Sequence, residues 1–289
     1  MNNNLVILAG GVSSRMKKQA ENLNSVDAKL LKDADNKSKA MIGVGSGYRP
    51  FMDYLLFNAK KAGYKNIVIV IGQKDNSIKD YYTNDKGKET FKDINFTFAV
   101  QPIPEGREKP LGTADALWHG LMAVKGWAGQ KFTVVNSDNL YSRTALRVML
   151  ESEHPNSMID YNRDGMEFDK ARIEGFAVTK KDENNFLLNI MEKPDQQTIE
   201  SAKGIDGFIG VSMNIFNLSY DMIFPFLEAC PLNPIRKEKE LPTAIKMMID
   251  AYPGSLFAYP LSEHVPDLTS KNDIEKIKEY LEKEFKELN

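Results

Sequence analysis

The chain has little of several residue types that whole classes of protein depend on. Cys230 is its only cysteine, which excludes an intramolecular disulfide framework and a cysteine-rich zinc site. Its three histidines are scattered singly, without the spacing of paired metal ligands. No stretch approaches the roughly 20 apolar residues of a membrane span, and the start lacks the basic, longer apolar pattern of a secretory signal. We therefore expect a cytoplasmic protein that does not enter a membrane.

Neither acidic nor basic residues predominate in the chain. The chain has 38 Lys and Arg against 40 Asp and Glu, a formal net charge of −2, and these residues are scattered rather than striped. Electrostatics therefore gives no reason to propose nucleic acid or an anionic membrane as a partner, while small anions remain candidate ligands. With 289 residues, 42% of them hydrophobic, the chain can bury a large core. We expect one domain, residues 1–289, with two lobes that divide near residue 150.

The apolar pattern predicts an α/β fold. Apolar runs and alternation predict strands at residues 5–8, 39–44, 67–71, 94–100, 132–135, 172–178, 186–191, 208–215 and 256–259. Helical spacing and stop signals predict helices at residues 50–62, 76–82, 113–124, 220–228, 240–251 and 274–288, with Thr113 as a candidate cap. Strand–helix–strand order in the first half predicts a parallel sheet with right-handed crossovers. The second half has fewer helices between its strands, which predicts a mixed extension of that sheet.

The first strand leads into a glycine pair, Gly10 and Gly11, with Arg15 a few residues further on. Such a loop exposes backbone N–H groups that suit phosphate oxygens, and an arginine adds a permanent positive charge. Taken alone, the loop favours the simpler interpretation, an ordinary strand-to-helix connection with a surface arginine. Asn136-Ser137-Asp138 follows another predicted strand, at the edge where open α/β sheets bind ligands.

Six motifs in order resemble those of the sugar-1-phosphate nucleotidyltransferases, also called sugar-nucleotide pyrophosphorylases. They are Leu8-Ala9-Gly10-Gly11 through Arg15, Lys39-Ala40-Met41 through Pro50, Gln101 with Pro110-Leu111-Gly112-Thr113-Ala114-Asp115, Asn136-Ser137-Asp138, Glu174-Gly175-Phe176 with Met191-Glu192-Lys193-Pro194, and Pro266-Asp267-Leu268. The resemblance implies a Rossmann-like, GT-A-like fold: a mixed, mostly parallel sheet flanked by helices. It also implies a nucleotide-binding lobe at about 1–150 and a sugar-phosphate-binding lobe with a C-terminal helix at about 151–289.

The resemblance implies a role for each matched residue. Arg15 and Lys39 would be catalytic, Arg15 on the β- and γ-phosphates and Lys39 on the α-phosphate. Asp138 and Asp267 would hold Mg²⁺, a cation that prefers oxygen ligands. Nucleotide-binding residues would be Leu8, Ala9, Gly10, Gly11, Gln101, Gly112 and Thr113, with the Gln101 amide reading a pyrimidine edge. Gly175, Glu192 and Lys193 would bind the sugar phosphate.

Each assignment has a simpler alternative. Lys39 could be an ordinary solvated lysine, and Asp138 could cap the next helix. Asp267 could belong to a plain Pro-Asp turn, and Glu192 could form a surface ion pair with Lys193. The polar stretch at residues 17–37, expected to be a surface excursion and part helix, is longer than the compact loop of the family.

The pattern favours transfer of a nucleotidyl group from an NTP, with UTP or dTTP preferred, to a sugar-1-phosphate. One alternative is cytidylyl transfer to phosphocholine or a similar small phosphate, which Asp160, Tyr161 and Phe176 would support by lining a pocket for a cation. A glycosyltransferase of similar fold is a weaker alternative, because Arg15 and Lys39 suit departure of pyrophosphate. A further alternative is a non-catalytic nucleotide-sugar sensor, since a fold does not guarantee activity. The sugar and the oligomeric state stay open.

Overall fold

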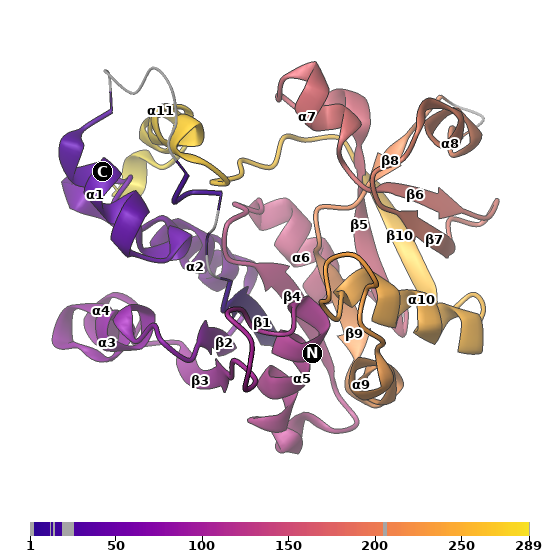
Figure 1. Cartoon of the computed structure of the whole chain (residues 1–289), viewed down its shortest axis with the longest axis horizontal. Helices are drawn as coiled ribbons and strands as arrows, with labels where there is room; N and C mark the ends of the chain where they lie inside the picture. Colours follow the sequence, from indigo (N-terminus) through magenta and orange to yellow (C-terminus); the bar gives the residue numbers. More distant parts are fainter. Residues whose placement is uncertain (1–2, 12, 14, 19–25, 205–206, 289) are drawn as a thin grey trace.

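One mixed sheet forms the centre of the protein. The computed structural model describes residues 3–11, 13, 15–18, 26–204 and 207–288. In this part of the chain the strands lie in the order β3-β2-β1-β4-β9-β5-β8-β6-β7, and β10 pairs with β5 (Figure 1). Residues 19–25 of the polar stretch, and positions 12 and 14 of the glycine loop, lie outside the described residues.

The first half of the sheet is parallel. β1 (Asn4–Ala9) lies between β2 (Asn66–Gly72) and β4 (Lys131–Asn136), and β3 (Asn95–Gln101) pairs with β2. All six residues of β1 are buried, as expected for a parallel strand that is covered on both faces. The predicted parallel order of this half is confirmed, and it brings the carboxyl ends of β1, β3 and β4 to one edge.

The second half is the predicted mixed extension. Its strands are β5 (Asn156–Asn162), β6 (Val178–Lys181), β7 (Leu187–Met191), β8 (Gly210–Val211), β9 (Phe216–Ser219) and β10 (Leu256–Leu261). β9 joins the two halves by pairing antiparallel to both β4 and β5, and β10 runs parallel to β5. β6 pairs antiparallel to β7 and β8.

Helices cover both faces of the sheet (Figure 1). They are α1 (Ala28–Asn36), α2 (Phe51–Ala62), α3 (Ser77–Thr83), α4 (Asp85–Thr90), α5 (Thr113–Met122), α6 (Arg143–Glu151), α7 (Lys170–Glu174), α8 (Gln196–Ser201), α9 (Tyr220–Ala229), α10 (Leu241–Ala251) and α11 (Ile274–Glu284). Each described helix is too short or too polar to cross a membrane.

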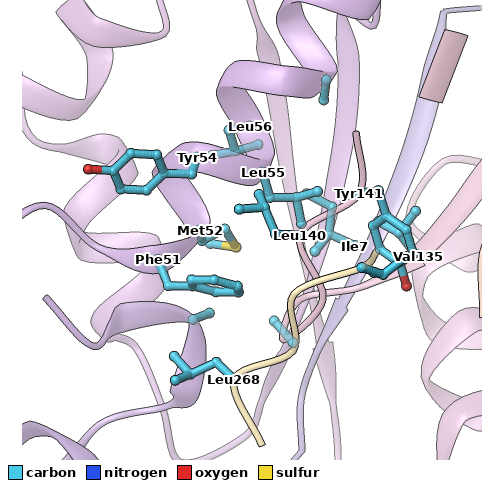
Figure 2. Packing of buried hydrophobic residues seen from close by; sticks show 14 of the residues in the cluster. Ile7, Phe51, Met52, Tyr54, Leu55, Leu56, Val135, Leu140, Tyr141 and Leu268 are labelled. Carbon is cyan, nitrogen blue, oxygen red and sulfur yellow. The ribbon is translucent and has the colours of Figure 1, made fainter. Parts of the chain in front are cut away.

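Successive side chains of β1 point to opposite faces and so enter two cores. Leu5 and Ile7 pack in the core that includes buried residues of α2, α6 and α11, whereas Val6 and Leu8 pack in the core under α5, α9 and α10. Figure 2 shows Ile7 and Val135 in the first core beside Leu55 of α2.

Three predicted strands are wrong in whole or in part. Residues 39–44 begin with a short 3₁₀ helix, Lys39–Met41, because a brief apolar run does not by itself distinguish strand from buried helix. Residues 172–178 begin inside α7, whose first turn is capped by Asp169 through a bond from the Arg172 amide. Residues 208–215 contain only the two-residue β8.

Candidate active site

The carboxyl ends of β1 and β4 and the loop after β3 surround a pocket of about 330 Å³. Predicted site residues that line it are Leu8, Ala9, Gly10, Gly11, Arg15, Lys39, Gln101, Gly112, Thr113 and Asp138. They come from five segments that are far apart in the sequence and meet because the strands are parallel. Gly175, Glu192, Lys193 and Asp267 do not line this pocket.

Lys39 and Asp138 form an ion pair across this pocket. The Lys39 Nζ lies 2.8 Å from Asp138 Oδ2, and the lysine side chain is 10% exposed. Lys39 is therefore not an ordinary solvated lysine. Asp138 does not cap the next helix either, because α6 is capped by Ser142, whose Oγ accepts from the Ala145 amide at 3.0 Å. The structure thus removes the simpler alternative for both residues.

Asp267 lies next to Asp138 although the two are far apart in the chain. The Leu268 amide donates to Asp138 O at 2.9 Å, and Asn139 and Asp267 form an antiparallel bridge. The Asp267 carboxylate accepts from Arg172 Nη2 at 2.8 Å and from Thr269 Oγ1 at 2.5 Å. Burial, and then repulsion by Asp138, raise the pKa of Asp267, while Thr269 and Arg172 oppose that rise.

This carboxylate pair fits a divalent cation that is shared with a substrate. The described residues contain no group of three or more His, Cys, Asp or Glu side chains arranged to hold a metal ion. Mg²⁺ often takes only one or two protein carboxylates and completes its shell with phosphate oxygens and water. Two neighbouring, mutually repelling carboxylates, Asp138 lining the pocket and Asp267 beside it, are a donor set of that kind.

The loop after β3 is ordered by the Gln101 side chain. The Gln101 Nε2 donates to Gly112 O at 2.9 Å and to Asp115 Oδ2 at 2.8 Å. Both partners are acceptors, so both hydrogens of the amide are used. The expectation that the Gln101 amide reads a pyrimidine edge therefore narrows to Oε1, which lies beside Gly10 and accepts no hydrogen bond from the described residues.

Thr113 does not cap α5 as expected. The cap residue of α5 is Gly112, which makes no side-chain bond, and Thr113 is the first residue of the helix. Its Oγ1 instead accepts from the Leu241 amide at 2.9 Å, which satisfies a free donor at the start of α10. The start of α5, where Thr113 lines the pocket, is thereby tied to the start of α10.

The predicted sugar-phosphate residues lie at the edge of the second half of the sheet. Gly175 directly follows α7, and Glu192 and Lys193 directly follow β7. The ion pair of Glu192 is with Arg236, at 3.1 Å, rather than with its neighbour Lys193. Burial, and then repulsion by Glu240, raise the pKa of Glu192. Lys193 has a positive φ of 47°, as the chain turns sharply after the strand.

A family model described as nucleotidyl transferase matches residues 34–251. The chain belongs to the nucleotidyl transferase family. Glucose-1-phosphate adenylyltransferase of Bradyrhizobium diazoefficiens is 26% identical over 192 residues, which are 65% of this chain and 41% of that protein. Bifunctional protein GlmU of Geotalea uraniireducens is 27% identical over 200 residues, 68% of this chain and 36% of that protein. The chain thus spans less than half the length of these curated relatives.

Solved structures of nucleotidyl transferases share this fold along nearly the whole chain. A UDP-glucose pyrophosphorylase complexed with UDP-glucose superposes with a TM-score of 0.69 at 17% identity, covering 98% of this chain and 99% of the other. A putative glucose-1-phosphate thymidylyltransferase from Bacillus anthracis has a TM-score of 0.63 at 19% identity, covering 97% and 95%. The predicted Rossmann-like, GT-A-like architecture is confirmed.

Sequence reasoning missed two arginines in this nucleotidyl transferase. Arg172 binds Asp267 and Asp273, and Arg236 binds Glu192 and Glu240. Each arginine connects a predicted site carboxylate to a second acidic residue. Arg236 and Glu240 are only four residues apart, but no spacing in the sequence reveals the pairs with the predicted site carboxylates: Arg172 and Asp267, for example, are 95 residues apart.

Proposed function

We propose that the protein transfers a nucleotidyl group from an NTP to a sugar-1-phosphate and releases pyrophosphate. The observation that carries this proposal is the convergence of Arg15, Lys39 and Asp138 on one pocket with the base-loop residues Gln101 and Gly112. Relatives in the family are named for adenylyl transfer to glucose-1-phosphate, which supports a sugar-1-phosphate as the acceptor.

The reaction joins two polyanions, so positive charge and positioning supply most of the catalysis. An oxygen of the sugar phosphate forms a bond to the α-phosphorus of the NTP. The bond from that phosphorus to the oxygen shared with the β-phosphate breaks, and pyrophosphate leaves with the electron pair. Arg15 would bind the β- and γ-phosphates, and Lys39 would bind the α-phosphate in exchange for Asp138. No protein nucleophile is needed.

Asp138 and Asp267 are the residues that would hold Mg²⁺, and the ion would supply positive charge to the phosphates. Lys193 would contact the sugar phosphate, and Glu192, held by Arg236, would accept from sugar hydroxyls. Gly175 would let the sugar approach the backbone closely. Gln101 Oε1 would accept from a base N–H, and we propose the N3–H of uracil or thymine as that group, with UTP or dTTP as the donor.

Pyrophosphate release tests this proposal with Mg²⁺, each of the four NTPs, and a panel of sugar-1-phosphates plus phosphocholine. Asp138→Asn should reduce the rate at least about a hundredfold, because it removes a metal carboxylate and the partner of Lys39. Asp250→Asn is the matched control, since it removes an exposed aspartate that pairs with Lys246 at 2.5 Å. Equal rates of pyrophosphate release by Asp138→Asn and Asp250→Asn would contradict the assignment of Asp138 to the active site.

The phosphocholine alternative loses its structural support. Asp160 is fully buried and already binds Lys181 and Thr179, so it cannot serve a cationic ligand in a pocket. The sensor alternative would gain support if the polar stretch at residues 17–37 filled the phosphate site. In its described part, Lys17, Asn36 and Lys37 line a second pocket of about 240 Å³ beside the first, rather than the first pocket itself.

A further inference from the structure

Arg172 joins the predicted acceptor segment to the predicted metal segment. Its Nη2 lies 2.8 Å from Asp267 Oδ2, and its Nη1 lies 2.6 Å from Asp273 Oδ1. The guanidinium carbon also lies 4.3 Å from the centroid of the Phe168 ring. Because two carboxylates and an aromatic ring contact the planar guanidinium, its orientation and position are fixed.

The backbone of Arg172 fixes the start of the acceptor segment, residues 174–176. The Gly175 amide donates to Arg172 O at 3.1 Å, directly after the five-residue helix α7. A helix of this length is not stable by itself in water, so its position depends on contacts with the rest of the protein. The segment between β10 and α11, which contains Asp267, passes beside α7 (Figure 1).

Asp267 is held in place by contacts that do not involve Arg172. The Leu140 amide donates to Pro266 O at 2.8 Å and the Leu268 amide to Asp138 O at 2.9 Å. Thr269 Oγ1 holds the other carboxylate oxygen, and the fully buried Leu268 is part of the core seen in Figure 2. Removing the Arg172 guanidinium would therefore remove a charge without releasing the carboxylate.

We propose that Arg172 is a positioning residue for acceptor segment 174–176, and that its guanidinium competes with the divalent metal for the carboxylate of Asp267. A positive group in contact with a metal ligand repels the metal, and this repulsion is strong in a partly buried site. Metal binding and the position of the acceptor segment are thereby coupled through one side chain. The metal and the acceptor rest on the proposed function, but the first measurement needs neither acceptor nor turnover.

That measurement is Mn²⁺ binding to the free protein, followed by electron paramagnetic resonance. Arg172→Gln should bind Mn²⁺ about tenfold more tightly than wild type, whereas Arg172→Lys, which keeps the charge, should stay within about threefold of wild type. Arg143→Gln is the matched control, because Arg143 also pairs with a carboxylate, Glu287, and lies near an aromatic ring. Unchanged or weaker binding by Arg172→Gln, or equally tight binding by Arg143→Gln, would overturn the competition. A wild-type protein that binds no Mn²⁺ would overturn it too.

Steady-state kinetics tests the positioning role. Arg172→Gln should raise KM for the sugar-1-phosphate about tenfold and leave KM for the NTP unchanged, with partial recovery in Arg172→Lys. Equal increases in both KM values would contradict the role, because they would indicate general damage to the fold. A wild-type protein that binds Mn²⁺ but transfers to no acceptor would refute the proposed function while leaving the competition result standing.

Discussion

Gly112→Ala is expected to disturb the loop after β3, in which Gly112 is the last residue before α5. Gly112 has φ of 107° and ψ of −171°, a conformation that residues with a Cβ rarely adopt. An added Cβ would lie 2.7 Å from Lys239 O and 3.0 Å from Glu238 Cβ, so the backbone of the loop between α9 and α10 would have to move.

The structure sets the size of the effect. The backbone conformation costs about 1 to 3 kcal/mol for a residue with a side chain. Moving Lys239 also weakens two hydrogen bonds, from the Ala114 amide to Lys239 O at 3.0 Å and from the Lys239 amide to Leu111 O at 2.5 Å. Each contributes about 1 kcal/mol. We expect Gly112→Ala to lower the free energy of unfolding by about 2 to 4 kcal/mol in total.

Gly106→Ala in the same loop is the matched control. Gly106 also has a positive φ, 76°, but an added Cβ there would meet nothing within 4 Å. This change should cost only about 1 kcal/mol. Urea unfolding measures both costs, and NTP titration should show weaker binding in Gly112→Ala alone. Equal losses of stability in the two variants, or unchanged NTP affinity in Gly112→Ala, would refute the argument.

Two further predictions concern buried charge and pH. Lys181→Met leaves the fully buried Asp160 without its cation and should lower the free energy of unfolding by about 3 kcal/mol at pH 7.5. Burial already raises the pKa of Asp160, so the variant should recover stability as pH falls toward 5 and the carboxyl takes a proton; an equal loss at both pH values in urea unfolding would contradict this. His264 Nδ1 accepts from the Glu167 amide at 3.2 Å, and burial lowers the pKa of His264. The neutral imidazole therefore stabilises the fold fully above the pKa of histidine in the unfolded chain, near 6.5, and this stabilisation is lost as pH falls. The stability difference between wild type and His264→Gln should therefore shrink by about 0.5 kcal/mol from pH 7.5 to 5.5, and a difference that stays constant would show that the imidazole is not held neutral.

The sheet edge that forms the pocket was predictable because its strands are long, apolar and buried on both faces. A continuous apolar run such as residues 67–71 is typical of a buried parallel strand. Because residues 132–135 form another such strand, the polar residues after it lie at the edge of the sheet where ligands bind. Short segments were not predictable in this way. Residues 172–178 contain apolar residues that suit a strand, but Asp169 before them caps a helix, and the cap determines the first turn.

Side-chain partners were harder to predict than elements. The sequence identified Gln101 and Asp115 as members of one motif. It did not reveal that both amide hydrogens of Gln101 donate to groups within the protein. It identified Asp267 and Glu192, but not Arg172 and Arg236, which bind them. Such pairs depend on how separate segments of the chain pack, and local patterns contain no information about a contact such as Arg172–Asp267, whose residues are 95 apart.

Product identity tests the central claim most directly. Phosphorus NMR of the protein with Mg²⁺, UTP or dTTP, and a sugar-1-phosphate distinguishes the products of transfer from those of hydrolysis. We expect pyrophosphate and a nucleoside diphosphate sugar in equal amounts, formed at least about a hundredfold more slowly by Asp138→Asn and at the wild-type rate by Asp250→Asn. Orthophosphate as the product, or no reaction with any sugar-1-phosphate while NTP still binds, would contradict nucleotidyl transfer at this pocket.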